Sequence, residues 1–342
     1  MRLLRYKPEV PNFGDDLNER LWPALAPALF GTGAGDSGHG DSFVGIGTIV
    51  GIDPGASRRL HVFSSGAGYT AADRWDGLDV QYHCVRGPVT ARVLGLSENA
   101  PLTDGAILAP LIADFRQTKG EGGGRTVIVP HFETIAFPGW ERTAVNSGFD
   151  LVDPRGTPEA VISALAGAQL VLTESLHGAI IADAYGVPWR GFAVSGNFSI
   201  AKWTDWTASM NIDAEVALVP PPDPMPLLRY GKREEQFGAM VQLDVEAALG
   251  EFKARIGPAA HVSFLKSKGK RILTESRLAR RLMGFSPERT AAALVGLAAR
   301  DPYLSRATLR DDLREKMLDR LDALVRNHCG HSVNVMRSLT AD

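Results

Sequence analysis

Cysteine is scarce in this sequence, and long apolar runs are missing. Cys84 and Cys329 are its two cysteines, too few for a disulfide framework and without the spacing of a zinc site, so we expect a reducing, cytoplasmic location. The longest charge-free apolar stretch, residues 42–52, is rich in glycine and far shorter than the roughly 20 residues of a membrane helix. Charges and prolines interrupt the start of the chain, so we expect no signal peptide.

An excess of one charge is also missing. The 37 Lys and Arg residues nearly balance 39 Asp and Glu, and the formal net charge of −2 argues against nucleic acid as a partner. Residues 253–281 are a local exception, with nine Lys or Arg and a single acid, Glu275. One interpretation is a solvated helix face. The other is a patch for anionic lipid headgroups, which would place the protein peripherally at the inner face of the cytoplasmic membrane.

Short β-branched runs alternate with helical patterns through the first 230 residues, which predicts an α/β fold with parallel sheets. Glycine-rich residues 119–124 and proline-rich residues 220–226 have the composition of connections. We therefore predict three regions: an N-terminal α/β domain over 1–120, a C-terminal α/β domain over 121–245, and a helical extension over 246–342. In the extension, Ser286 is suited to cap a helix that begins at Pro287. Apolar residues recur every four positions on one face of a later helix: Leu309, Leu313, Met317 and Leu321.

The stretch LVLTESLHGAIIADAYGVPW, residues 170–189, indicates a buried strand followed by a helix that ends at Gly186. His177 then lies in the first turn of the helix, at the carboxyl end of a strand, where free N–H groups and the helix dipole favour an anion. The same field would lower the pKa of His177 unless a bound anion or Glu174 restores it. The alternative is a structural histidine whose ring is satisfied by backbone carbonyls.

Two acidic residues follow a tight turn near the start of the chain. In NFGDDLNE, residues 12–19, Asn12 and Gly14 are expected to form the turn, and Asp15 or Asp16 is expected to cap the next helix. Capping accounts for one aspartate. The second is suited to act as a base or to bind sugar hydroxyls, and capping alone is the alternative.

Arg86 and His131 also stand where strands are expected to end. The guanidinium of Arg86 is matched to a carboxylate or phosphate, and the alternative is a structural ion pair with an acid such as Asp79 or Asp104. His131 would join His177 on one wall of an interdomain cleft, with Arg86, Asp15 and Asp16 on the other.

Glycines in GIGTIVG (45–51) and SSGAG (64–68) permit close backbone approach to a ligand, with Ser65 and Gly66 in the second segment. Neither has the order of a dinucleotide fingerprint, and no P-loop motif occurs.

Taken together, NFGDDLNE, the glycine turns, VRGPVT (85–90), TDGAILAPL (103–111) and above all TESLHGAIIADAYGVPW (173–189) resemble the polysaccharide pyruvyl transferase family. The resemblance spans about residues 10–195 and is strongest to the bacterial branch that forms ketals on exopolysaccharides. It implies two Rossmann-like domains facing across a cleft, as in GT-B glycosyltransferases. It also implies transfer of pyruvate from phosphoenolpyruvate, as co-substrate, onto two hydroxyls of a hexose to give a cyclic 4,6-ketal. That chemistry requires no metal or other cofactor. The acceptor is a saccharide, either lipid-linked or a soluble repeat unit.

One departure from the family concerns the helix that carries the histidine. Many members read Ser-Arg-Leu-His-Gly there, whereas this chain reads Glu174-Ser175-Leu176-His177-Gly178, so the arginine is missing.

The resemblance leads to a set of predicted roles. His177 is the predicted general acid or base, His131 could exchange roles with it, and Asp15 or Asp16 orients or deprotonates the acceptor. The residues predicted to bind the donor are Arg86, Glu174, Ser175 and Gly178. The residues predicted to contact the acceptor or shape the loops are Asn12, Gly14, Ser65, Gly66 and Asp104.

Two other functions are weighed against this one. A nucleotide-sugar glycosyltransferase of the GT-B type would share the two domains and the anion-binding helix ends. A non-catalytic carbohydrate-binding protein would use tryptophans such as Trp203 and Trp206 to stack on sugar rings, although large aromatic side chains are more often part of the core.

Overall fold

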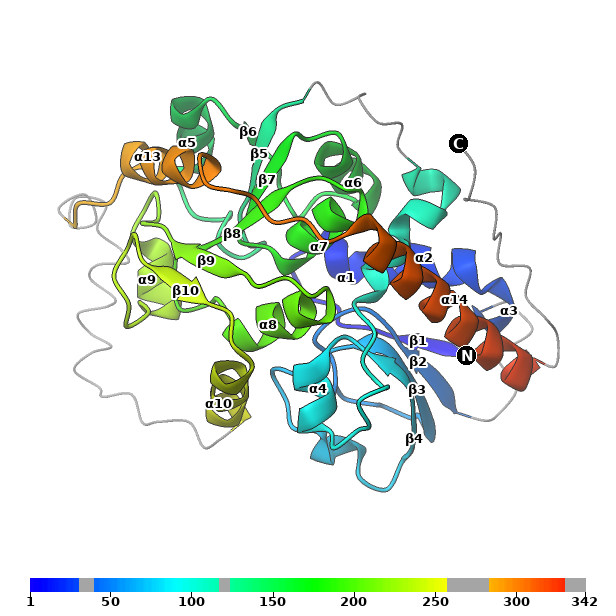
Figure 1. The fold of residues 1–342 in the computed structure, drawn as a ribbon. Helices are drawn as coiled ribbons and strands as arrows, with labels where there is room; N and C mark the ends of the chain where they lie inside the picture. The colour runs from blue at the N-terminus through cyan, green and yellow to red at the C-terminus, as the bar shows by residue number, and fades with distance from the viewer. Residues whose placement is uncertain (31–39, 117–123, 257–282, 330–342) are drawn as a thin grey trace.

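Two mainly parallel sheets organise the computed structural model, which describes residues 1–30, 40–116, 124–256 and 283–329 (Figure 1). The first sheet has the order β1-β2-β3-β4, and all its strands are parallel: β1 Arg2–Leu4, β2 Asp41–Val44, β3 Arg59–Ser65 and β4 Asp79–Val85. The second has the order β10-β9-β8-β7-β5-β6, and β10 pairs antiparallel with β9: β5 Thr126–Val129, β6 Asp150–Leu151, β7 Leu170–Thr173, β8 Trp189–Ala193, β9 Glu215–Leu218 and β10 Met240–Gln242. The predicted α/β fold with Rossmann-like parallel sheets is confirmed.

Helices connect and cover these strands. The α-helices in the described residues are α1 Phe13–Asp16, α2 Asn18–Leu25, α3 Pro27–Phe30, α4 Pro88–Val93, α5 Trp140–Ser147, α6 Pro158–Ala166, α7 Leu176–Ala184, α8 Ile200–Ser209, α9 Met225–Tyr230, α10 Val245–Ile256, α13 Pro287–Ala298 and α14 Ala307–Cys329. Short 3-10 turns are η1 Ala72–Trp75, η2 Gly105–Leu111 and η3 Ala113–Phe115. None of these helices is long and apolar enough to span a bilayer.

Local sequence explains where the key helices begin and end. Ser175 caps α7, because its hydroxyl accepts a hydrogen bond from the Gly178 N–H at 3.4 Å, and Gly186 takes a left-handed conformation (φ +73°) just after the helix. Ser286 caps α13 in the same way, with Pro287 as the first helical residue. Both helix starts agree with the sequence prediction.

The order of strands in the second sheet creates a natural binding position. Strand β5 pairs with β6 on one side and β7 on the other, so the chain changes direction across the sheet at β5. Ligands of open α/β sheets bind beside the carboxyl ends of the strands at such a switch point. His131 follows β5 and His177 follows β7, so both lie at this position.

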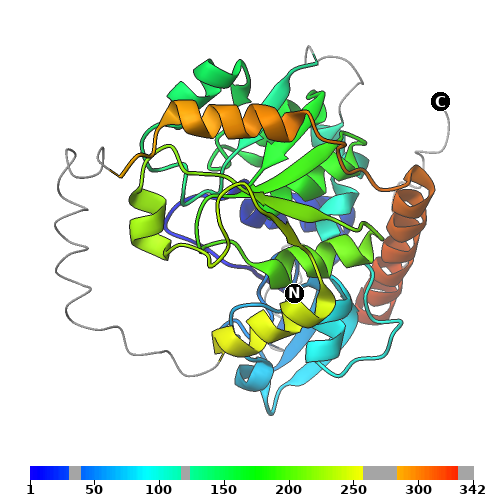
Figure 2. The ribbon, with the colours of Figure 1, turned by 60° about the vertical axis from the view of Figure 1, so that its left-hand side comes forward.

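A shared core joins the two sheets to the C-terminal helices. Phe43 and Phe63 of the first sheet belong to the same apolar cluster as Trp189 of the second and Met317 of α14. Helix α14 packs against α3, β4 and η2, while α13 lies against α5 on the other side of the molecule (Figures 1 and 2). The predicted apolar face of α14 is confirmed, since Leu313, Met317 and Leu321 are buried and Leu309 packs beside them.

The predicted division at residues 120 and 245 stays a prediction. The connection at 119–124 and the basic stretch at 253–281 lie almost entirely outside the described residues.

Candidate active site

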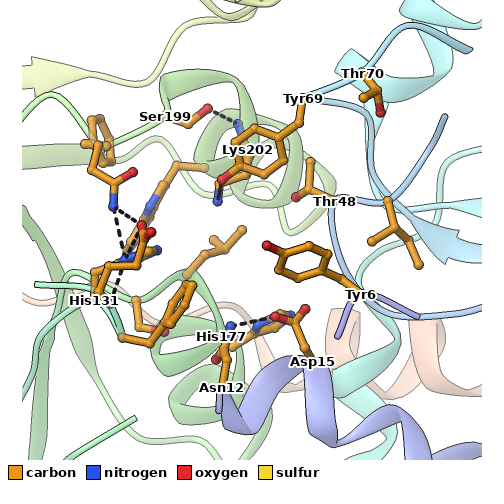
Figure 3. Close-up of a pocket in the computed structure, with 18 of the residues that line it drawn as sticks. Tyr6, Asn12, Asp15, Thr48, Tyr69, Thr70, His131, His177, Ser199 and Lys202 are labelled. Atoms are coloured by element: carbon orange, nitrogen blue, oxygen red, sulfur yellow. Dashed lines mark hydrogen bonds and ion pairs between the residues drawn. The ribbon is translucent and has the colours of Figure 1, made fainter. Parts of the chain in front are cut away.

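A cavity of about 590 Å³ lies where the carboxyl ends of the two sheets come together (Figure 3). Thr48, Tyr69 and Arg86 line it from segments that follow strands β2, β3 and β4. His131 and His177 line it from segments that follow β5 and β7. The volume falls in the range of small-molecule sites in proteins.

His177 is buried against the backbone of α1. A Cβ on Gly14 would lie 1.9 Å from His177 Nδ1, so only glycine permits this approach. Its Nε2 atom is buried and has no hydrogen-bond partner among the described residues, which argues against the structural alternative for this nitrogen. Burial, followed by the charges of Arg86 and Lys202, lowers the pKa of His177 to about 3. The imidazole is therefore neutral at pH 7, with a nitrogen available to a ligand.

Arg86 is fully buried and held by two neighbours. Its Nε donates to Asp205 Oδ2 and its Nη1 donates to Thr48 Oγ1, both at 2.9 Å, whereas Nη2 is buried with no partner among the described residues. The structural ion pair given as the alternative for Arg86 is therefore present, but its acid is Asp205. The acids named from the sequence were wrong, because Asp79 pairs with Arg59 and Asp104 caps η2 by accepting from the Ala106 N–H. The unused Nη2 donor suits an anionic ligand.

The Arg-Gly-Pro motif owes its geometry to Asp205 on α8. The Asp205 carboxylate also accepts from the Thr90 N–H at 2.9 Å and the Thr90 hydroxyl at 2.6 Å, which satisfies the first turn of α4. A Cβ on Gly87 would lie 1.8 Å from the Asp205 carbonyl oxygen, and one on Gly66 would lie 2.2 Å from Arg86 Cζ. These two glycines let α8 and the end of β3 close around the guanidinium.

The two aspartates after Asn12 have different surroundings. Asn12 itself caps α1 by accepting from the Gly14 N–H, so the expectation that Asp15 or Asp16 forms the cap was wrong, because the chain is already helical at Phe13. Asp15 lines the cavity and accepts a 2.8 Å hydrogen bond from Asn12 Nδ2. Burial raises its pKa to about 6, against the opposing effects of Asn12 and Lys202. Asp16 instead pairs with Arg5 at 3.0 Å, outside the cavity lining.

Glu174 anchors loops rather than the His177 ring. Its carboxylate accepts from the His131 N–H at 3.0 Å, the Thr134 hydroxyl at 2.5 Å and the Val194 N–H at 3.2 Å. It therefore ties the segments after β5 and β8 to the end of β7. His131 in turn lies 3.1 Å from Asn197 Nδ2 through its Nδ1 atom, and burial followed by the charge of Lys202 lowers its pKa to about 3.

The remaining predicted residues lie behind those that line the cavity. The Ser65 hydroxyl donates to the Gly45 carbonyl, and a Cβ on Gly178 would lie 2.4 Å from Thr173 Oγ1. Asp104 is buried away from the cavity lining, where burial raises its pKa to about 6. The predicted residues that line the cavity are Asn12, Asp15, Arg86, His131, Glu174, Ser175 and His177.

Lys202, which the sequence reasoning missed, lines the same cavity. It lies in the first turn of α8, with its Nζ 4.7 Å from the centre of the Tyr69 ring and donating to the Tyr69 hydroxyl (Figure 3). Lys202 and Asp205 lie three positions apart in IAKWTDWTAS, so they share one side of a helix whose other residues are mostly buried. Two charged residues on one side of an otherwise buried helix are the sequence signal that could have identified Lys202 and Asp205 as site residues. Trp203 and Trp206 beside them are buried, as expected for core residues.

Comparison with known proteins relates this chain to a family. Residues 29–196 match the family model described as polysaccharide pyruvyl transferase. Over this stretch the chain is similar to the polysaccharide pyruvyl transferase family. The match covers His177, Arg86 and His131, but it ends before Lys202 and Asp205 and begins after the Asn12 turn, which the predicted span of about 10–195 included.

A similar protein is the succinoglycan biosynthesis protein ExoV of Rhizobium meliloti (strain 1021). The two sequences are 33% identical over 216 residues, which represent 61% of this chain and 65% of ExoV. The alignment thus covers slightly less than two thirds of that relative.

Proposed function

We propose that this protein transfers pyruvate from phosphoenolpyruvate onto two hydroxyls of a hexose in an exopolysaccharide repeat unit, forming a cyclic 4,6-ketal. The observation that carries the proposal is a neutral, buried imidazole with an unpartnered nitrogen in the same cavity as two cations, Arg86 and Lys202. The match to the polysaccharide pyruvyl transferase family model and the similarity to a succinoglycan biosynthesis protein support it. The convergence of both sheets on one cavity supports a GT-B-like arrangement.

Phosphoenolpyruvate brings a phosphate and a carboxylate, so its pocket needs fixed positive charge. Arg86 offers its unused Nη2 and Lys202 its ammonium, while the N–H groups at the start of α7 add partial positive charge. Lys202 takes the place of the arginine that many family members carry where this chain has Ser175. An arginine is thus replaced by a point charge from another helix, which binds an anion without the fixed fork geometry.

Binding of phosphoenolpyruvate also favours protonation of His177. The pKa of His177 is low because of burial and the two neighbouring cations, and a trianionic ligand offsets those cations. The imidazolium then gives its proton to the methylene carbon of phosphoenolpyruvate, which becomes the methyl group, and positive charge develops at C2. A sugar hydroxyl attacks C2, and the second hydroxyl displaces phosphate. Of the two hydroxyl protons, one replaces the proton used by His177, and the other passes through Asp15 to the departing phosphate.

Asp15 and two exposed tyrosines form the acceptor side. The pKa of Asp15, raised to about 6, suits a base that takes a hydroxyl proton near neutral pH, and Asn12 holds the carboxylate in place. Tyr6 is 49% exposed at the cavity, where its ring is available to stack on a sugar, whereas Tyr69 lines the same cavity with Lys202 over its ring (Figure 3). The scheme uses no metal or cofactor.

The test is incubation of the full chain with phosphoenolpyruvate and a panel of lipid-linked and soluble oligosaccharides. Phosphate release should accompany a mass gain of one pyruvate less water on one acceptor, and the lipid-linked and soluble arms decide the form of that acceptor. Turnover of a sugar nucleotide instead would favour a glycosyltransferase. Saccharide binding without consumption of phosphoenolpyruvate would favour a non-catalytic carbohydrate-binding protein.

A further inference from the structure

A second cluster of polar side chains lies inside the first sheet, away from the cavity. Asp41 begins β2, His61 is the third residue of β3, and His328 lies near the end of α14. One ligand atom from each lies within 4.8 Å of the other two. Residues that lie nearly 300 positions apart in the sequence thus meet at one point, between the sheet and the helix that packs on it.

His61 is the buried member, and one of its nitrogens lacks a partner. Its Nδ1 lies 3.0 Å from His83 Nε2, a hydrogen bond that fixes the ring. Its Nε2 is buried, has no hydrogen-bond partner among the described residues, and lies 3.7 Å from Asp41 Oδ2. That distance is too long for a hydrogen bond but suits two atoms that share a ligand. A histidine that binds a metal commonly makes such a bond through its second ring nitrogen.

The spacing of the donor atoms fits one small cation. Atoms bound tetrahedrally at 2.0–2.1 Å to zinc lie roughly 3.4 Å apart. Asp41 Oδ2 lies 3.7 Å from His61 Nε2 and 3.8 Å from His328 Nδ1, so small side-chain shifts complete the geometry. The nearest competitor is Arg59, whose Nη1 is 3.9 Å from Asp41 Oδ2 but whose Nε pairs with Asp79 at 2.5 Å.

We propose that Asp41, His61 and His328 bind a divalent transition metal, zinc being the best match, with His83 as the residue that orients His61. Two imidazoles and one carboxylate form a donor set that zinc uses in proteins, with water in the fourth position. The metal fastens the end of α14 to the first sheet. The sequence predicted no metal site, because cysteine spacing was its guide and these ligands have no local motif.

The test is calorimetric titration of the chelator-treated full chain with zinc sulfate. One equivalent should bind to the unaltered protein and raise its melting temperature by several degrees, since zinc binds the folded state. His328→Gln, at a partly exposed position, should abolish saturable binding and the thermal shift without unfolding the protein. Asp41→Asn should do the same. His83→Gln leaves all three ligands in place and should weaken zinc binding about 10- to 100-fold.

The matched control is His131→Gln, which removes a partly buried histidine from the cavity and should leave zinc binding unchanged. Visible absorption of bound Co²⁺, altered in His328→Gln but not in His131→Gln, would locate the metal independently of stability. The proposal is overturned if the unaltered protein binds no zinc, if His328→Gln binds it equally well, or if binding is lost in His131→Gln instead. None of these outcomes depends on pyruvyl transfer.

Discussion

Two pairs of histidines, each with one buried and one partly buried member, occupy different parts of the same α/β framework. His131 and His177 follow strands of the second sheet, whereas His61 and His83 lie within strands of the first. Burial lowers the pKa in all four. Their charged neighbours differ, because Lys202 acts on both cavity histidines while His61 faces the carboxylate of Asp41.

The comparison shows that burial alone does not decide what an imidazole can do. Beside cations, a neutral ring is placed to receive an anion and then a proton. Beside a carboxylate, a neutral ring is placed to share a cation. The following substitutions test that distinction.

The largest expected effect on activity comes from His177→Gln. His177 is the general acid of the proposed reaction, and loss of such a group typically costs 10²–10⁴-fold, so the proposed pyruvyl transfer should fall by that factor while circular dichroism and melting temperature change little. The matched variant at the other pair, His83→Gln, should leave turnover nearly unchanged. Equal activity losses in both variants would mean that the cavity histidine has no special role.

The next largest effect is a loss of stability on removal of the Asp205 carboxylate, which pairs with Arg86. Asp205→Ala leaves a buried guanidinium unpaired and removes the acceptor for the first turn of α4, so it should cost about 3–5 kcal/mol of unfolding free energy. Asp79→Ala, which breaks the solvent-exposed pair with Arg59, should change the free energy of unfolding far less. Urea denaturation of both variants measures the difference, and similar values would contradict the structural role of Asp205.

Sequence reasoning succeeded where local patterns dictate structure. The strand, the start of the helix and its end at Gly186 in the His177 segment follow from adjacent residues, and the position of Arg86 follows from the strand before it. The prediction of a helix cap near the start of the chain was wrong. Asn12 caps α1 in place of Asp15 or Asp16, because the helix begins earlier than the paired aspartates suggested.

What sequence reasoning missed depends on contacts between distant segments. Arg86 and Asp205 are 119 positions apart, and Lys202 reaches the cavity only because α8 packs beside α4. The cluster of Asp41, His61 and His328 likewise exists only after α14 has packed on the first sheet. Contacts between residues so far apart in the chain produce no recognisable spacing pattern in a single sequence.

A smaller effect is expected from Lys202→Met. Removing this ammonium should raise the KM for phosphoenolpyruvate about 10- to 100-fold with a smaller change in kcat, whereas Lys202→Arg should retain much of the affinity. The pKa values of His131 and His177 should rise, because Lys202 lowers both. Two-dimensional NMR of the imidazoles measures those shifts, and unchanged values would place Lys202 too far away to act on either ring.

The smallest effect concerns acid stability and His83. Burial lowers the pKa of His83 to about 4, below the unfolded value near 6.5, so the unfolded state takes up a proton first as the pH falls between these values. The group therefore lowers the free energy of unfolding over that window and contributes no further slope below about pH 4. Because His83 is only partly buried, the loss is on the order of 1–2 kcal/mol. His83→Gln should show a correspondingly shallower decline in urea stability between pH 6.5 and 4, measured without metal, while Gln81→Asn, on the same strand, should follow the unaltered protein. If the urea stability of His83→Gln declines as steeply as that of the unaltered protein, the His83 ring has an ordinary pKa in the folded protein. Its ring nitrogen would then accept a proton as readily as it accepts the hydrogen bond that orients His61.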